Sequence, residues 1–147
     1  MLIILNVCRW SHPDLTTLST DGITSQMTQL EDALTSIVGF FPQYMRPPYY
    51  AYNSQVLQTL GSLGYHVILS DIDTLDWENN SPSAIGQSVS IFQNGLNSGG
   101  TLSLEHDTLQ NTVETLAPAM INAIKAKGLR GKQNSISYLF EKTRTDS

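Results

Sequence analysis

Apolar residues recur at intervals of three and four along several stretches of the chain, the spacing that predicts the buried face of an amphipathic helix. The first such stretch follows Ser19, Thr20 and Asp21, whose side-chain oxygens favour a helix start, and it is expected to close at Gly39. A second helix is expected after Asn53, with Gly64 as its stop. The residues predicted to face inward on these two helices are Ile23, Met27, Leu30, Leu34, Ile37, Val56, Leu57, Leu60 and Leu63.

Two more helices are predicted in the second half of the chain. One carries its apolar face from Ile85 to Leu96 and is ended by Asn97–Gly100, a stretch that contains two glycines. The other covers Asn111–Lys127, with Gly128 just beyond its end. The residues expected to face inward are Ile85, Val89, Phe92, Leu96, Val113, Leu116, Met120, Ile121 and Ile124.

Short apolar runs between these helices predict strands. His66–Ile72 is expected to be a mostly buried strand, and Thr101–Glu105 is expected to be another. Phe40–Tyr52 contains three prolines and four tyrosines and is predicted to be a structured loop. Strands that alternate with helices are typical of an α/β protein with a parallel sheet.

The charge of the chain excludes one class of partner. Its 147 residues include 8 Lys and Arg against 13 Asp and Glu, a formal net charge of −5. A protein that follows nucleic-acid phosphates needs clustered basic side chains, and the sequence has none, so no nucleic acid is expected as a partner. No apolar run approaches the roughly 20 residues of a membrane span. Nothing in the sequence indicates a protein partner.

The start of the chain predicts neither a disulfide framework nor an export signal. Cys8 is the single cysteine, so an internal disulfide is excluded. Met1–Val7 is apolar, but it lacks the basic residues and the small-residue cleavage site of a signal peptide. A chain that opens on such a strand-like run is expected to be an N-terminally truncated piece of something longer.

Polar side chains follow both predicted strands, where α/β proteins place many of their active sites. His106 comes after the second strand. It is either a structural residue with a satisfied hydrogen bond or a general acid or base, because imidazole titrates near neutral pH. After the first strand, Asp73 and Asp76 fit a turn and a helix cap, or one of them orients His106. The spacing leaves these alternatives open.

Three further features have both a structural and a functional interpretation. Arg46 precedes two prolines and is either a surface charge on a stiff turn or a guanidinium that holds a carboxylate. His12, with only Cys8 near it, is a weak metal site by spacing alone. Aromatic residues are expected either to pack in the interior or to line a groove where sugar rings stack: Tyr49, Tyr50, Tyr52 and Trp77.

Taken in order, four of these segments resemble the motifs of one enzyme family. They are Trp-Ser-His-Pro-Asp-Leu at 10–15, Arg-Pro-Pro-Tyr at 46–49, Asp-Thr-Leu-Asp-Trp at 73–77 and Leu-Ser-Leu-Glu-His-Asp at 102–107. Together they resemble the polysaccharide deacetylases, the NodB-like carbohydrate esterases of family four, and most of all the fungal chitin deacetylases. The resemblance implies an α/β fold, an incomplete distorted (β/α) barrel. It implies a partial deacetylase domain over residues 1–131 and a divergent tail over 132–147.

The resemblance also implies a reaction and its substrate. Members of the family remove N-acetyl groups from chitin or related N-acetylglucosamine polymers and are typically secreted or bound to the cell wall. They hold a divalent metal, commonly zinc, through one aspartate and two histidines, and His12 corresponds to the second of these histidines. Leu104 would line the pocket for the acetyl methyl group, and Trp77 would form a wall of the substrate groove.

Catalytic roles are implied for five residues. His106 would protonate the leaving amine, with either Asp73 or Asp76 as its partner. Arg46 would orient the aspartate that acts as general base. The backbone N–H of Tyr49 would contact the substrate and help to stabilise the tetrahedral oxyanion.

The sequence departs from the family pattern at three points. The Thr-Phe-Asp-Asp-Gly-Pro motif, which carries the base and the aspartate ligand, is absent from these 147 residues. Cys8 stands where the first metal histidine is expected, as a weak substitute ligand, and Tyr50 replaces a glycine. Two hypotheses therefore remain: a metal-dependent deacetylase, or a non-catalytic glycan-binding relative or inactive gene fragment.

Overall fold

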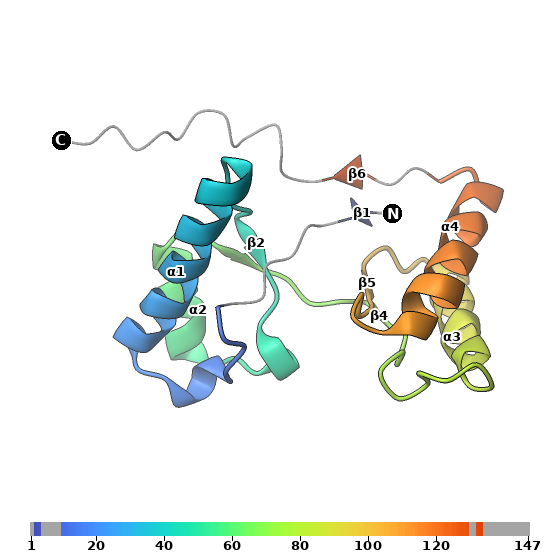
Figure 1. Cartoon of the computed structure of the whole chain (residues 1–147), viewed down its shortest axis with the longest axis horizontal. Helices are drawn as coiled ribbons and strands as arrows, with labels where there is room; N and C mark the ends of the chain where they lie inside the picture. The colour runs from blue at the N-terminus through green and yellow to red at the C-terminus, as the bar shows by residue number, and fades with distance from the viewer. Residues whose placement is uncertain (1, 4–9, 130–131, 134–147) are drawn as a thin grey trace. The chain divides into compact units, whose positions relative to one another are not determined.

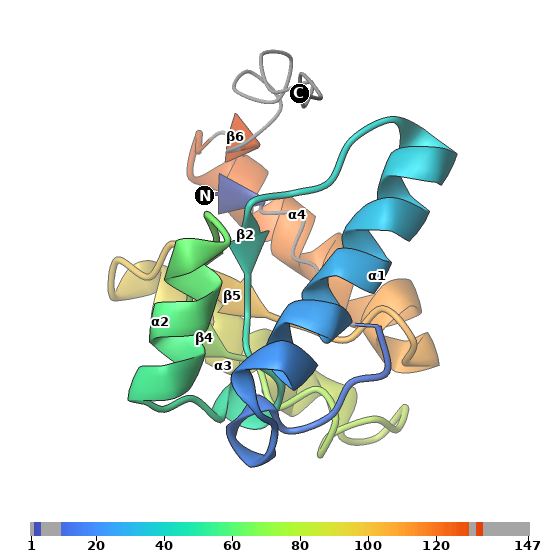
Figure 2. The same cartoon turned by 90° about the vertical axis from the view of Figure 1, so that its left-hand side faces the viewer.

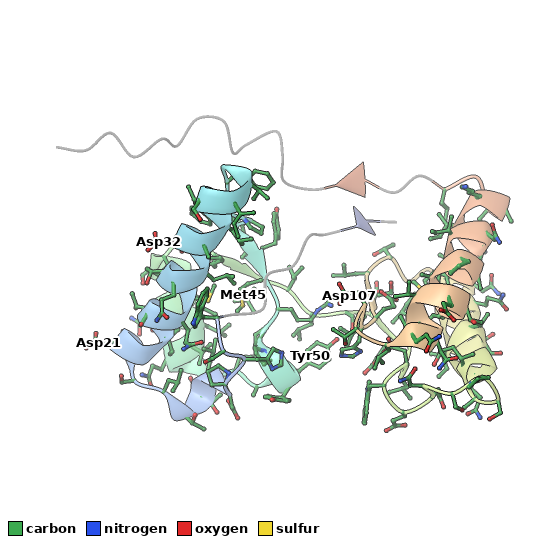
Figure 3. All side chains as sticks on the ribbon, viewed as in Figure 1. Asp21, Asp32, Met45, Tyr50 and Asp107 are labelled. Atoms are coloured by element: carbon green, nitrogen blue, oxygen red, sulfur yellow. The ribbon has the colours of Figure 1, made fainter. Side chains whose placement is uncertain are left out.

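The first helix follows its sequence pattern closely. In the computed structural model, which describes residues 2–3, 10–129 and 132–133, α1 runs over Thr20–Val38. The Ser19 side chain accepts the N–H of Gly22, and Gly39 ends the helix at a φ of +82°, which glycine adopts without strain. Asp21 and Asp32 project outward from α1 (Figure 3). Ile37 was predicted to face inward but is exposed, because the buried residues of α1, Ile23 and Met27, both lie in the first half of the helix.

A β–α–β arrangement follows α1. It consists of β2 (Tyr44–Met45), α2 (Ser54–Ser62) and β3 (His66–Val67), and the two strands pair in parallel with Tyr44 opposite His66. Because β2 lies within 40–52, the prediction of a loop there is wrong for these two residues. The same segment also holds the short 3-10 turn η2 (Pro48–Tyr50).

The core of this part lies between α1, α2 and β2. α1 packs against α2, with β2 beside them (Figure 2). A short 3-10 turn, η1 (Leu15–Thr17), adds Leu15 to the core and is capped by Asp14. Leu57 was predicted to be buried but is exposed, because it lies one position, and therefore about 100° around α2, from the buried Val56. The buried cluster comprises Leu15, Ile23, Met27, Met45, Val56, Leu60 and Tyr65.

A second β–α–β arrangement uses the next strands. β4 (Ile72–Asp73) and β5 (Ser103–Leu104) pair in parallel on either side of α3 (Ile85–Asn97) in the sequence, with Asp73 opposite Leu104. The prediction of one strand over 66–72 is wrong, since β3 pairs with β2 and β4 pairs with β5. Between β3 and β4 the chain divides into two compact units, a first unit (residues 10–69) and a second unit (residues 70–129).

The last helix is interrupted. A π-helical turn, η3 (Thr112–Leu116), precedes α4 (Ala117–Ala126). Pro118 has no N–H with which to bond the carbonyl four residues earlier, so the regular ladder cannot run through this point. α4 packs on α3 (Figure 1, orange and yellow). Val113 and Ile121 were predicted to face inward but are exposed. The buried stripe of η3 and α4 has a spacing of four and consists of Thr112, Leu116, Met120 and Ile124.

A further pair of short strands lies outside these two arrangements. β1 (Leu2–Ile3) pairs with β6 (Lys132–Gln133) as a separate two-stranded sheet. Within the described part of the chain, every helix is too short or too polar to cross a bilayer. The residues that matter for the site follow the carboxyl ends of the parallel strands: Arg46 follows β2, the 74–80 loop follows β4, and His106 lies just beyond β5.

Candidate functional site

In the second unit, Asp76 and His106 form a close pair. The Nδ1 atom of His106 lies 2.7 Å from Oδ1 of Asp76, and the backbone N–H of His106 donates to Oδ2, also at 2.7 Å. The Asp76 side chain is 0% exposed and that of His106 is 41% exposed. A buried carboxylate therefore holds both the ring and the backbone of a histidine that solvent can reach.

The backbone of the 73–76 turn selects Asp76 as the partner. Asp73 is exposed, and its Oδ1 accepts the N–H of Leu75 at 3.1 Å, so it closes a turn and does not contact His106. Leu75 has a φ of +51°, a left-handed conformation that is uncommon for a leucine. Buried Thr74 donates to the carbonyl of Leu104 at 2.7 Å. These contacts fix the direction of the loop and carry Asp76 into the interior.

Thr112 is a residue of this cluster that the sequence pattern did not single out. Its hydroxyl donates to Oδ2 of Asp76 at 2.8 Å, and its side chain is buried. The available signal was its position, because Thr112 lies four residues before Leu116 and eight before Met120 on the buried stripe of the last helix. A polar residue on such a stripe needs a hydrogen-bond partner.

The pair leaves one ring nitrogen of His106 for chemistry. A carboxylate accepts hydrogen bonds, so the Asp76 contact favours the tautomer that carries its proton on Nδ1. Nε2 is then the atom that can exchange a proton with a bound molecule, as a general acid or base requires. Two neighbouring residues have predicted substrate-binding roles and differ in exposure: Leu104 is half-buried at the end of β5, and Trp77 is 55% exposed beside Asp76.

In the first unit, two predicted site residues contact each other. The rings of His12 and Tyr49 meet edge to face, with centroids 5.2 Å apart and planes at 85°. The turn before η1 is held by Ser11, which donates from its N–H and its hydroxyl to Oε1 of Gln26, while Oδ1 of Asp14 accepts the N–H of Thr16. Both His12 and Tyr49 are exposed, and both have a positive φ, of 57° and 55°.

Arg46 and the turn after it are held by prolines. Arg46 follows β2 and is half-buried, while Pro47 and Pro48 are buried. Tyr49 and Tyr50 then adopt φ values of 55° and 54° in succession. Glycine adopts this left-handed backbone without a side-chain clash. The conformation is therefore consistent with the glycine that the family resemblance implies at the position of Tyr50. The turn leaves the Tyr49 ring 72% exposed.

The described residues do not form a metal site by themselves. Residues 2–3, 10–129 and 132–133 contain no group of three His, Cys, Asp or Glu side chains placed to hold an ion. Zinc needs three or four protein ligands, and His12 offers one imidazole. Cys8, the other predicted ligand, lies outside the described residues.

The comparisons with known proteins identify the family. Residues 8–68 match the family model of the polysaccharide deacetylases. A chitin deacetylase of Pestalotiopsis sp is 62% identical over 120 residues, which cover 82% of this chain and 40% of that protein. This chain belongs to the polysaccharide deacetylase family.

Solved structures of family members share the fold. The chitin deacetylase of Colletotrichum lindemuthianum is 40% identical and matches with a TM-score of 0.80, over 87% of this chain and 58% of that one. A CE4 family pseudoenzyme from Bacillus anthracis matches at 23% identity with a TM-score of 0.71, over 91% of this chain and 45% of that one. The predicted fold class, a partial (β/α) barrel of the polysaccharide deacetylase type, is thereby confirmed. The matched region of this chain spans 40% of the length of the Pestalotiopsis deacetylase and 58% of the Colletotrichum structure.

Proposed function

We propose that this chain forms part of a hydrolase that removes N-acetyl groups from chitin or related N-acetylglucosamine polymers, in a secreted or wall-bound protein. The observation that carries the proposal is the buried Asp76 carboxylate, 2.7 Å from Nδ1 of a solvent-accessible His106. The names of the similar proteins from Pestalotiopsis and Colletotrichum, both chitin deacetylases, support this substrate class.

His106 is the proposed acid. Cleavage of an amide requires a proton on the departing nitrogen, and Nε2 of His106 can deliver it while Nδ1–H stays bonded to Asp76. The Asp76 carboxylate offsets the positive charge of the ring when both nitrogens are protonated. Asp76 thus orients the acid and stays in place when the proton leaves.

The remaining predicted residues take supporting roles in the proposal. The N–H of Tyr49 stabilises the tetrahedral oxyanion, and Arg46 orients the general-base aspartate, which belongs to a motif absent from these 147 residues. Leu104 lines the acetyl pocket, and Trp77 forms a groove wall on which a sugar ring stacks. A divalent metal, zinc by family resemblance, is part of the proposal, with His12 as one ligand.

The test joins the chain to the part of a relative that it lacks. The segment of the Colletotrichum chitin deacetylase that precedes the matched region is fused before residue 1, and acetate release from chitin oligomers is measured. We expect release by the fusion and a fall of about 10²-fold or more in His106→Ala. His66→Ala, which alters an exposed histidine of β3, is the matched control and should keep its activity. Equal rates for the His106 and His66 variants would refute the proposed acid.

A non-catalytic glycan-binding relative is the second candidate. It is favoured by Cys8 at a position where the family has a metal histidine and by the missing Asp-Asp motif. The fold alone does not decide, since a CE4 pseudoenzyme shares it. Binding of chitin oligomers without acetate release from the fusion, together with loss of binding in Trp77→Ala, would favour this candidate over the hydrolase.

A further inference from the structure

We infer that Thr112 is a positioning residue for His106, acting through Asp76. The Thr112 hydroxyl donates to Oδ2 of Asp76 at 2.8 Å, while Oδ1 of the same carboxylate faces Nδ1 of His106 at 2.7 Å. The Thr112 side chain is buried, so its effect passes through the orientation of the carboxylate. The inference rests on the proposed function for its catalytic consequence, but its structural consequence can be measured without activity.

The hydrogen bond from Thr112 to Asp76 differs from those that other helical threonines of this chain make. Thr24, Thr28 and Thr59 each donate to the carbonyl four residues earlier in their own helix. Thr112 instead donates to a carboxylate 36 residues away in the sequence. It stands at the start of the π-turn, where its own carbonyl accepts the N–H of Ala117 five residues on. Such wide turns in helices often occur at functional sites.

The burial of Asp76 makes this hydrogen bond consequential. A carboxylate that is fully shielded from water needs donors for both oxygens, and Oδ2 has two described ones, the N–H of His106 and the hydroxyl of Thr112. Loss of the hydroxyl leaves Oδ2 with one donor and frees the carboxylate to turn about its Cβ–Cγ bond. Oδ1 then no longer holds Nδ1 in one direction, and the ring of His106 loses its fixed tautomer.

The first test reads the tautomer of His106 directly. Nitrogen NMR of the ring is recorded for the full chain and for Thr112→Val, Thr112→Ala and Thr112→Ser. We expect a single Nδ1-protonated form in the parent chain and in the serine variant, which keeps the hydroxyl. The valine and alanine variants should both give a mixture of tautomers. If Thr112→Val does not fold, the Thr112→Ala variant alone provides the measurement. Thr59→Val is the matched control, because Thr59 is also buried but donates within its own helix.

The second test separates the inference from the proposed function. In the fusion with the Colletotrichum segment, Thr112→Val should lower kcat about tenfold with KM unchanged, the effect expected for one hydrogen bond to a charged group. Thr112→Ser should restore the rate. If the tautomer shifts in the valine and alanine variants but even the parent fusion releases no acetate, the positioning role stands and the proposed hydrolase fails. If the tautomer is the same in all variants, the positioning role is overturned whatever the rates are.

Discussion

Thr101 donates two hydrogen bonds to the carboxylate of Asp71, from its N–H at 2.9 Å and from its hydroxyl at 3.2 Å. The N–H of Leu102 adds a third at 2.8 Å. Asp71 precedes β4 and Thr101 precedes β5, so one side chain joins the starting ends of both paired strands. Burial alone would raise the pKa of Asp71, but these hydrogen bonds hold the pKa below its ordinary value.

The first prediction concerns Asp71 and acid stability. A carboxylate whose pKa is lowered in the folded chain contributes stability above its unfolded pKa, and this contribution is lost as the pH falls through the folded value. We expect the free energy of unfolding of the parent chain to drop as the pH falls below about 4. Asp71→Asn should cost about 0.5 kcal/mol at pH 7, because solvent screens the exposed carboxylate, and should show a flatter acid profile. Denaturant titrations between pH 3 and 7 measure both, and equal acid slopes would contradict the prediction.

The second prediction concerns alkaline stability and the Tyr65–Glu31 contact. The Tyr65 hydroxyl donates to Oε1 of Glu31 at 2.8 Å and joins the residue that precedes β3 to α1. Burial first, then this hydrogen bond and the negative charge of Glu31, raise the pKa of Tyr65 well above its ordinary value. Stability from a raised pKa is present below the unfolded value and is lost as the pH rises past it, near 10.

Tyr65→Phe should therefore cost about 1 kcal/mol at pH 7 and make the chain less sensitive to pH above 10. Unfolding curves at pH 7 and at pH 10 to 11 measure the difference. Tyr52→Phe is the control, because Tyr52 is exposed and should leave both values unchanged. A loss in Tyr65→Phe that grows at alkaline pH would show that the contact acts in another way.

The sequence was sufficient where local rules decide the structure. Ser19, Asn53 and Gly39 cap helices as predicted, because a cap depends on one side chain or one backbone conformation next to the helix. The pairing of β3 and β4 with different strands was not predictable in this way. An apolar run specifies burial, but its partner strands lie elsewhere in the chain.

The candidate site shows the same limit. Asp73 and Asp76 were equivalent candidates, and the left-handed backbone of Leu75, which directs Asp76 inward, has no signal in the sequence. Thr112 was missed because Val113 and Ile121 were assigned inward for being apolar, whereas the buried stripe has a strict spacing of four. The contact of His12 with Tyr49 joins residues 37 positions apart, beyond the reach of any local pattern.

The third prediction concerns zinc. The chain is expected to bind zinc weakly, since His12 and Cys8 make two candidate ligands where a zinc site has three or four. His12→Ala should weaken the remaining affinity about tenfold or more, because one of the two ligands is lost. Competition with a coloured chelator measures the affinity. His66→Ala is the matched control among the exposed histidines, and an equal loss there would mean that the ion binds without a defined site.

The last prediction concerns the packing of β4 on α3. Gly95 and Gly86 both lie in α3, but only Gly95 faces Ile72, a buried residue of β4. A Cβ at Gly95 would lie 2.7 Å from Cγ1 of Ile72, whereas a Cβ at Gly86 would have no neighbour within 4 Å. Ile72 belongs to the buried cluster of the second unit, so it cannot move aside without disturbing a closely packed core. The members of this cluster are Ile72, Ile85, Phe92, Leu96, Leu116, Met120 and Ile124.

Gly95→Ala should therefore destabilise the chain by roughly 1–3 kcal/mol through overpacking. Gly86→Ala should be neutral or stabilise it by up to about 1 kcal/mol, because alanine favours the helix over glycine. Thermal and denaturant unfolding of the two variants and the parent chain measure these differences. The helix-propensity gain is nominally the same in both variants, so the gap between them isolates the contact with Ile72. If Gly95→Ala were as stable as Gly86→Ala, β4 would not lie as close to α3 as the structure places it.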